Sequence, residues 1–404
     1  MVQAEPACKT HGRVVRPQSL RAQMVPERKT TRRQFLKGRA AVDALQDLGQ
    51  AAPEAFPQPA SAAPSATPAY LVQISRRAMA ADFEIFLNAA QHGRATETAL
   101  QALDLVEELE GQLTVYRPHS EVMGINRRAA GGPVTVEARL FATLQLALNL
   151  SRETGGAFDI TAGPLSQVWG FYRRAGQLPD AESLQQALSR VGYRHLELDD
   201  ELRTIRFLRR GVEINLNAVG KGYAVDRCAE LLREAGVEDF LIHGGQSSVL
   251  AGGSRAGAEF DSRGWSVALR HPLKPQQRLA EIWLRNRALG TSGSGVQFFH
   301  HQGRRYGHVL DPRTGWPAEG VLSATVLAPG AALADAVSTA CFVIGREGAQ
   351  EYCRNHPDVS AILVCPGQRS GSLDIQAYGM QPDDWRRLDL PAGAASAPTT
   401  PPAA

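Results

Sequence analysis

Three short segments of this 404-residue chain contain the side chains best suited to chemistry. In the first, Lys221 stands between two glycines, after an apolar run at 212–216 that predicts a short strand. An amphipathic helix is expected to follow and to end at Gly236. Free N–H groups and a fixed positive charge at a helix N-terminus commonly bind phosphate or pyrophosphate. An ordinary solvated turn has a similar local sequence, so this pattern alone leaves both interpretations open.

The second segment, 331–344, predicts a helix with Asp335 in its first turn and Thr339 one turn later. A spacing of four places both side-chain oxygens on one face of a helix. Such oxygens suit a hard divalent cation that keeps water and substrate phosphate as its remaining ligands. The alternative for Asp335 is a carboxylate at a helix N-terminus with no metal.

The third segment is an apolar strand that carries His308 and closes in a turn beginning at Asp311. An imidazole titrates near neutral pH, so His308 is a candidate for transferring a proton. Asp311 either orients this histidine or only binds its own turn backbone. His300 and His301, in a hairpin, are interpreted as surface residues.

Both helices and strands are expected to position these three segments. Apolar spacing predicts helices at about 94–113, 138–153 and 181–191, and a strand ending at Pro118. Further strands are expected at 71–75, 81–87, 265–270, 279–284, within 296–310, at 323–329 and at 360–366, with a hairpin turning at 199–201. The segment 154–171 is expected to be a loop that brings backbone close to a flat ligand. The predicted class is α+β, with a large, mostly antiparallel sheet and packed helices.

The amino-acid composition argues against several kinds of binding partner and structural site. The hydrophobic and charged fractions, 43% and 21%, are typical of a globular protein, and a net charge of +3 without a basic block argues against a nucleic-acid partner. No apolar stretch approaches the roughly 20 residues needed to cross a bilayer, so no transmembrane segment is expected. The five scattered cysteines argue against a structural zinc site and a disulfide framework.

The chain divides into three parts. Residues 1–69 form a predicted leader, in which TRRQFLK (31–37) resembles a twin-arginine export signal and an Ala/Pro-rich linker is expected to be disordered. Export to the periplasm or cell envelope is one interpretation, and a cytoplasmic basic tail is the other. Residues 70–380 form the predicted domain, and 381–404 a polar, Ala/Pro-rich disordered tail.

Eight motifs, in order, resemble those of the ApbE family, the FAD:protein FMN transferases, over about residues 70 to 370. They are MAADFEIFL, LTVYRPHSEVMGIN, GGAFDITAGPL, NAVGKGYAVD, HGGQ, GTSGS, HVLDPRTG and ADAVSTA. The resemblance implies a T-fold-related architecture and a magnesium-dependent enzyme with FAD as substrate. It implies transfer of FMN to a threonine hydroxyl of a flavin-accepting redox protein, with release of AMP. Some relatives instead hydrolyse FAD to FMN and AMP, and a degenerate flavin-binding module is a further alternative.

Site residues follow from the same resemblance. It implies Mg²⁺ at the carbonyl of Ala218 with Asp335 and Thr339, and His308 with Asp311 near the reacting phosphate. The flavin nucleotide is expected against Met79, Tyr116, Asn126, Ala157, Phe158, Asp159, Asn215, Lys221, Gly245, Thr291, Ser292 and Val309.

Four positions depart from the family pattern by lacking an acid. Asn215, Gln246 and Ser294 stand where relatives usually or often have a carboxylate, and Ser338 replaces a helical acid of some relatives. Because a hard cation depends largely on anionic oxygens, these changes predict weaker magnesium binding.

Overall fold

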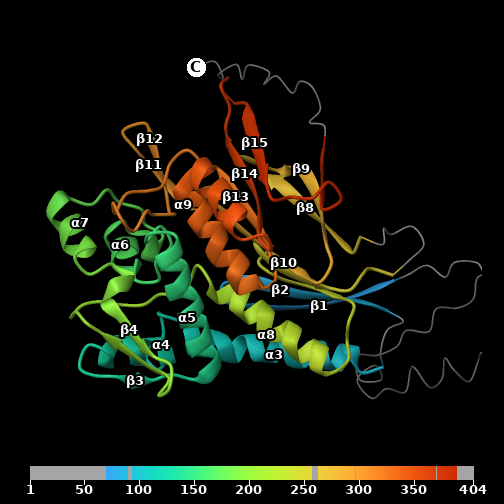
Figure 1. The fold of residues 1–404 in the computed structure, drawn as a ribbon, viewed down its shortest axis with the longest axis horizontal. Helices are drawn as coiled ribbons and strands as arrows, with labels where there is room; N and C mark the ends of the chain where they lie inside the picture. Colours follow the sequence, from blue (N-terminus) through green and yellow to red (C-terminus); the bar gives the residue numbers. More distant parts are fainter. Residues whose placement is uncertain (1–69, 90–92, 257–262, 296, 370, 389–404) are drawn as a thin grey trace, which may run out of the picture. The chain divides into compact units, whose positions relative to one another are not determined.

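A large antiparallel sheet supports the other elements (Figure 1). The computed structural model describes residues 70–89, 93–256, 263–295, 297–369 and 371–388. In spatial order the eight-stranded sheet contains β1 (Leu71–Ala78), β2 (Ala81–Asn88), β6 (Phe240–Gly244), β7 (Ser248–Gly252), β10 (Arg287–Gly293), β13 (Ser323–Ala328), β14 (Ser360–Pro366) and β15 (Leu373–Tyr378). Each pairing between these described strands is antiparallel, as in the predicted α+β class.

The two faces of this sheet carry different layers. Three helices, α3 (Ala95–Leu113), α8 (Gly220–Glu234) and α9 (Ala331–Asn355), pack on one face. The other face packs against a smaller sheet of β16 (Trp385–Arg387), β9 (Lys274–Leu284) and β8 (Trp265–His271). Because side chains alternate along a strand, Ile85 and Ile242 enter the helical core whereas Phe86 and Leu241 pack on the opposite side.

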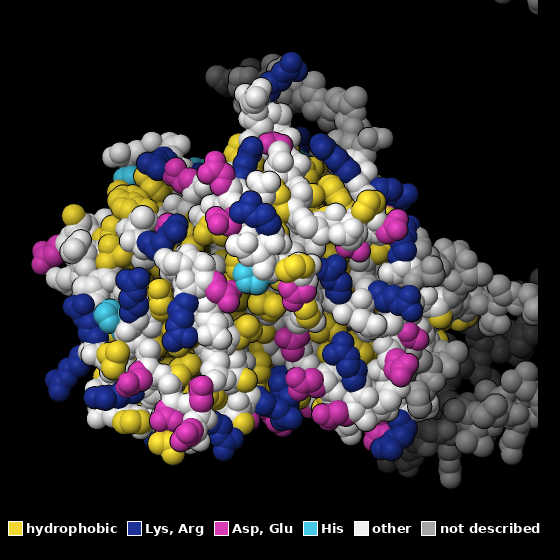
Figure 2. Space-filling view, in the orientation of Figure 1, with side chains coloured by type: hydrophobic (Ala, Val, Ile, Leu, Met, Phe, Trp, Pro, Cys, Tyr) yellow, Lys and Arg dark blue, Asp and Glu magenta, His cyan; other side chains and the backbone are white. Residues whose placement is uncertain are grey.

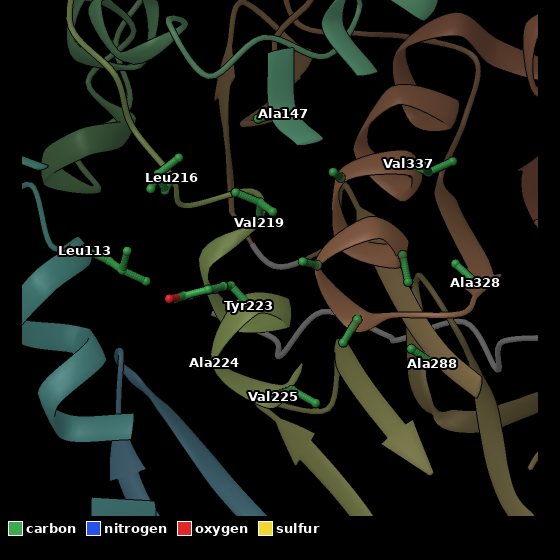
Figure 3. Packing of buried hydrophobic residues seen from close by; sticks show 14 of the residues in the cluster. Leu113, Ala147, Leu216, Val219, Tyr223, Ala224, Val225, Ala288, Ala328 and Val337 are labelled. Atoms are coloured by element: carbon green, nitrogen blue, oxygen red, sulfur yellow. The ribbon is translucent and has the colours of Figure 1, made fainter. Parts of the chain in front are cut away.

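Small residues bring α9 very close to its neighbours. A Cβ on Gly222 of α8 would lie 2.2 Å from the carbonyl oxygen of Ala331, and one on Gly290 of β10 would lie 2.4 Å from the carbonyl carbon of Ala334. Figure 3 shows the same core, with Tyr223 of α8 directed toward Leu113 of α3. Glycine is therefore required at these two contacts, because a side chain would overlap backbone atoms of α9.

A second group of elements packs partly on the main core and partly around a small aromatic core. It contains α4 (Glu121–Arg128), α5 (Ala138–Glu153), α6 (Gly163–Val168), α7 (Ala181–Leu188), the 3-10 turns Phe171–Arg173 and Tyr193–His195, the sheet of β3 (Val134–Thr135), β5 (Thr204–Phe207) and β4 (Leu196–Asp199), and the hairpin of β11 (Phe298–His301) and β12 (Arg304–Gly307). Trp169 is fully buried in this core, and its indole N–H donates to the carbonyl of Gly315 over 2.8 Å. That bond ties the turn after His308 to α6.

Several local predictions are wrong. The segment before Pro118 forms no strand; Ser120 instead caps the unpredicted helix α4 by accepting from Met123 N–H. The run 212–216 forms no strand, since the Asn126 side-chain amide pairs with both backbone groups of Ile214. The predicted loop at 154–171 contains α6 and enters the 3-10 turn Phe171–Arg173.

Two more local corrections concern the strands within 296–310 and the start of a helix. Within the described residues 297–310 only β11 and β12 are strands, followed by an isolated bridge between Leu310 and Pro317. The first turn of α9 contains no acidic residue, because the helix starts at Ala331 and Asp335 lies just beyond that turn.

The two ends of the chain differ in how much of each the structure describes. The predicted leader and linker lie outside the described residues. The predicted tail at 381–404 overlaps the folded part, because β16 pairs with β9 and Trp385 packs against the second core. Among the described residues, no helix is both long and apolar enough to cross a membrane. On the face in Figure 2, cationic and anionic side chains are interspersed.

Candidate functional site

Asp335 is held by groups from two other elements. Its Oδ2 accepts from the backbone N–H of Gly222 on α8 (2.8 Å) and from the hydroxyl of Ser248 on β7 (2.6 Å). No hydrogen bond from a described residue reaches its Oδ1. Burial raises the pKa of Asp335 to about 7, although Lys221 and the two hydrogen bonds act in the opposite direction. A carboxylate in this position is strongly desolvated and is stabilised by a nearby positive charge.

Hydroxyl groups surround the next turn of α9. Thr339 Oγ1 and Ser338 Oγ both donate to the backbone carbonyl of Asp335, over 3.2 and 2.8 Å. Ser292 Oγ on β10 lies 2.9 Å from both of these hydroxyl oxygens. With its proton directed to the carbonyl, Thr339 presents oxygen lone pairs to the surrounding space.

Lys221 lies in the first turn of α8, where the sequence predicts it. Its charge acts on the carboxyl of Asp335 and on the imidazole of His308, which are far apart in sequence. Just before the helix, the side chain of Asn215 accepts from Asn217 N–H over 2.9 Å, and Ala218 is partly buried against the main core. The predicted phosphate-binding and metal-binding residues therefore share one electrostatic neighbourhood.

His308 is positioned through Gln297. The backbone N–H and the ring Nδ1 of His308 lie 3.2 and 3.0 Å from the carbonyl oxygen of Gln297. Because a carbonyl oxygen only accepts, Nδ1 carries a proton and Nε2 of the neutral ring is left as the acceptor. Burial, with a smaller effect from Lys221, lowers the pKa of His308.

Asp311 is engaged in its own turn. Its carboxylate accepts from the guanidinium of Arg313 through both oxygens (2.8 Å each) and from Arg313 N–H. Its backbone carbonyl accepts from Gly315 N–H. No hydrogen bond joins it to His308 among the described residues. The turn-shaping interpretation describes these contacts, whereas a role in orienting His308 has no contact to support it.

The residues expected around the flavin differ in how far they are exposed to solvent. Tyr116 is 59% exposed, and Met79 and Val309 are partly buried at the ends of their segments. By contrast, Ala157 and Phe158 are buried. The side chains of these two residues belong to the interior rather than to a surface open to a ligand.

Asn126 and Asp159 have structural contacts instead. The Asn126 amide holds Ile214, as described above, and the buried carboxylate of Asp159 accepts from Thr161 and from Tyr193 N–H. Burial raises the pKa of Asp159 against these hydrogen bonds. Both residues brace the segments that carry Asn215 and Phe158.

The remaining expected nucleotide contacts lie in the turn between β6 and β7 and in the second half of β10. Gly245 and Gln246 form the turn between β6 and β7, both with positive φ (63° and 64°). Thr291 of β10 binds Thr325 through its hydroxyl (2.9 Å) and lies beside Ser292. Ser294, one of the positions that lacks an acid, lies 3.4 Å from the carbonyl of Leu322 through its hydroxyl oxygen. The exposed positions of His300 and His301 confirm their interpretation as surface residues.

Four residues important to this arrangement were missed in the sequence. Ser248 binds Asp335, and Gly222 and Gly290 allow the close approach of α9. Asp226 of α8 caps α9, since its two carboxylate oxygens accept from the N–H groups at the start of that helix (2.7 and 2.8 Å). Gly222 ends the motif GKG and Gly290 begins the motif GTSG, so both glycines were visible in the sequence. In the sequence, however, a glycine required for close packing looks the same as a glycine required for a turn.

The donor set is compatible with a hard cation. Among the described residues, no group of three or more His, Cys, Asp or Glu side chains could hold a metal ion, so a cation here depends on Asp335 with neutral oxygens. Mg²⁺ typically binds one or two carboxylates, several waters and substrate phosphates. One buried carboxylate, hydroxyl oxygens, a helix-terminal lysine and a histidine thus have the chemistry that suits one class of site, a site for a phosphate-bearing ligand together with a divalent cation.

Comparison with known proteins identifies the family. The ApbE family model matches residues 79–363, and the chain belongs to this family. The FAD:protein FMN transferase of Treponema pallidum is 32% identical over 281 residues, covering 67% of this chain and 77% of the relative. One from Klebsiella pneumoniae is 31% identical over 282 residues, covering 69% and 85%.

Solved structures agree with this assignment. The ApbE protein of Thermotoga maritima matches with a TM-score of 0.66 at 26% identity, covering 76% of this chain and 96% of that chain. The flavin transferase ApbE from Vibrio cholerae matches with the same TM-score at 25% identity, covering 77% and 98%. The predicted family and its mixed, mostly antiparallel fold are therefore confirmed.

Proposed function

We propose that this protein transfers the FMN half of FAD to a threonine hydroxyl of an acceptor protein, with Mg²⁺ bound, and releases AMP. The relatives named FAD:protein FMN transferase support flavin transfer from FAD. The observation that supports it most directly is that the first turn of α8, which carries Lys221, binds Asp335 through Gly222 N–H, while the charge of Lys221 also acts on His308. These are the charges that phosphoryl transfer requires at one place: a fixed cation, a metal-binding carboxylate and a proton acceptor.

In this reaction the threonine oxygen forms a bond to the phosphorus of the FMN half. The bond from that phosphorus to the bridging oxygen breaks, and AMP leaves with the electron pair. His308 Nε2 accepts the hydroxyl proton, because Nδ1 is committed to the carbonyl of Gln297. The lowered pKa keeps this imidazole neutral at neutral pH and therefore able to accept a proton.

Lys221 and the start of α8 bind the negative charge of the pyrophosphate. The ligands for Mg²⁺ would be Asp335, Thr339 and the carbonyl of Ala218, and the bound cation would supply charge neutralisation at the phosphates. Gly222 and Ser248 orient Asp335 for this role through their hydrogen bonds to Oδ2.

The acidic residues that this chain lacks determine how tightly Mg²⁺ is expected to bind. Asn215, Gln246, Ser294 and Ser338 are all uncharged, so Asp335 provides the main negative charge. We expect weak binding of Mg²⁺ to the free protein and stronger binding when FAD contributes its phosphates. Calorimetric titration with and without FAD measures both affinities, and sub-micromolar binding to the free protein would contradict this expectation.

The activity is tested by incubating the purified protein with FAD, MgCl₂ and an acceptor peptide that contains threonine. Mass spectrometry should find peptide carrying FMN, and chromatography should find an equal amount of AMP. His308→Gln should lower the rate by about 10²–10⁴-fold, the usual contribution of general acid–base catalysis. The matched control is His300→Gln in the exposed hairpin, which should leave the rate unchanged.

Other outcomes distinguish the alternatives. FMN and AMP without modified peptide would indicate an FAD hydrolase. FAD retained tightly with no AMP would indicate a flavin-binding module and would refute transfer. Equal rates for both histidine variants would refute the role of His308 while leaving the activity itself established.

A further inference from the structure

The 3-10 turn Phe171–Arg173 lies between two residues of the proposed site. It is flanked by left-handed backbone at Gly170 (φ 70°) and Arg174 (φ 54°), so the chain reverses tightly on both sides. Consecutive side chains of this turn then contact different neighbours. Phe171 is buried in the small aromatic core, and Tyr172 contacts the segment that carries Tyr116.

Tyr172 contacts that segment in two ways. Its ring lies 4.7 Å from the ring of Tyr116, centroid to centroid, at an angle of 37°. Its hydroxyl donates to the backbone carbonyl of Val115 over 3.1 Å. Residues 114–120 belong to no helix or strand, and these contacts join the segment to the turn. Tyr116 would otherwise depend on its own exposed segment for its orientation.

Phe171 connects the same turn to His308. Its carbonyl accepts from the side-chain amide of Gln297 over 2.8 Å, and the carbonyl of Gln297 in turn binds His308. The rings of Phe171 and His308 also meet edge to face, with centroids 6.4 Å apart. The 3-10 turn Phe171–Arg173 therefore connects the exposed ring of Tyr116 to the imidazole of His308 through a continuous series of contacts.

We propose that Tyr172 is a positioning residue that holds Tyr116 as a stacking surface for a planar ring of FAD, at a set place relative to His308. This inference rests on the proposed function, because the ring belongs to the substrate named there. Burial, Tyr116 and Glu213 raise the pKa of Tyr172, so its hydroxyl stays protonated and able to donate to Val115. The side-chain amide of Gln167 on α6 donates to the carboxylate of Glu213 over 3.1 Å, so the helix that leads into the turn contacts the segment that leads to Lys221.

Two variants separate the ring from the hydroxyl. Tyr172→Leu removes the stacked ring and should weaken FAD binding by about threefold to tenfold, the value of an aromatic pair. Tyr172→Phe keeps the ring but loses the bond to Val115, and should weaken binding by up to about fivefold. Flavin fluorescence quenching measures the dissociation constant of FAD. The rate at saturating FAD should stay unchanged, because Tyr172 does not touch the reacting atoms.

The matched control is Tyr352→Phe. Tyr352 also stacks on a neighbouring ring, His356, at 4.0 Å, and its hydroxyl binds Glu153, but it lies toward the far end of α9 from Asp335. This variant should keep the wild-type affinity for FAD. Parallel titrations with FMN and ADP identify the ring that lies on Tyr116, since only the ligand with that ring should lose affinity in Tyr172→Leu.

Wild-type affinity of both Tyr172 variants for FAD, FMN and ADP would overturn the inference. If Tyr172→Leu is less stable, Tyr172→Phe decides, because it changes one atom. An unmodified protein that binds FAD but releases no AMP would refute the proposed transfer and leave the positioning role supported by the affinities. An unmodified protein that does not bind FAD would refute both.

Discussion

Replacing Gly222 with alanine tests the contact that brings the α8 segment bearing Lys221 against α9. The added Cβ would lie 2.2 Å from the carbonyl oxygen of Ala331 and 2.4 Å from its carbonyl carbon. Both neighbours are backbone atoms, which cannot rotate away. Ordinary contact begins at 3.4 Å, so the two helices would have to separate by about 1 Å.

The expected cost has two parts. Overpacking typically costs about 1–3 kcal/mol, and losing the hydrogen bond from Gly222 N–H to the buried carboxyl of Asp335 costs about 1.5–3 kcal/mol. The higher helix propensity of alanine than of glycine offsets about 1 kcal/mol of this cost. The free energy of unfolding should therefore fall by about 1.5–5 kcal/mol, which is large beside the usual stability of a domain.

Urea unfolding followed by circular dichroism measures this change, with the slope of the free energy against urea as a check on the unfolded state. Gly111→Ala in α3 is the matched control, because no atom lies within 4 Å of its added Cβ. It should raise stability by up to about 1 kcal/mol. A Gly222→Ala protein as stable as the wild type would refute the packing argument.

Three further predictions concern single groups of the site. Ser248→Ala removes one donor to buried Asp335 and should lower the free energy of unfolding by about 1–3 kcal/mol in the same urea assay, whereas no change would show that the bond contributes little. Burial raises the pKa of Asp226 to about 6 from 3.8, so its contribution to stability is fully present below pH 3.8 and is lost as pH rises through about 6; Asp226→Asn should flatten this fall, and an unchanged slope between pH 4 and 6 would contradict the assignment. The lowered pKa of His308 predicts that, when saturating Mg²⁺ keeps Asp335 ionised, transfer declines only below pH 6.5, and a decline beginning above that pH in the pH–rate profile under the same conditions would exclude His308 as the base.

The sequence predicts those elements whose signals are local. The helix at 138–153 and the strand at 360–366 match α5 and β14 at both ends, because apolar spacing and end residues lie within the segment itself. The segments before Pro118 and at 212–216 were predicted as strands from composition alone. A strand needs a partner for its backbone groups, and at 212–216 the amide of Asn126 takes that place.

For the site, the order of motifs was sufficient to predict the ApbE family and the presence of Lys221, Asp335 and Thr339 in one neighbourhood. A role for Asp311 in orienting His308 could not be judged from the sequence, since an Asp-Pro turn has the same letters whether the carboxylate faces a histidine or, as here, Arg313. The direction of that side chain depends on the packing of the turn against α6.

The sequence by itself thus determined the family, the fold class and most of the residue types of a phosphoryl-transfer site. Only the tertiary structure decided how Asp335 is held, that Asp226 caps α9 and that Tyr172 supports Tyr116. The physical reason is that these contacts join residues distant in sequence. Their geometry depends on how closely α8, β7 and α9 approach, and that distance is set by the absence of a side chain at Gly222 and Gly290.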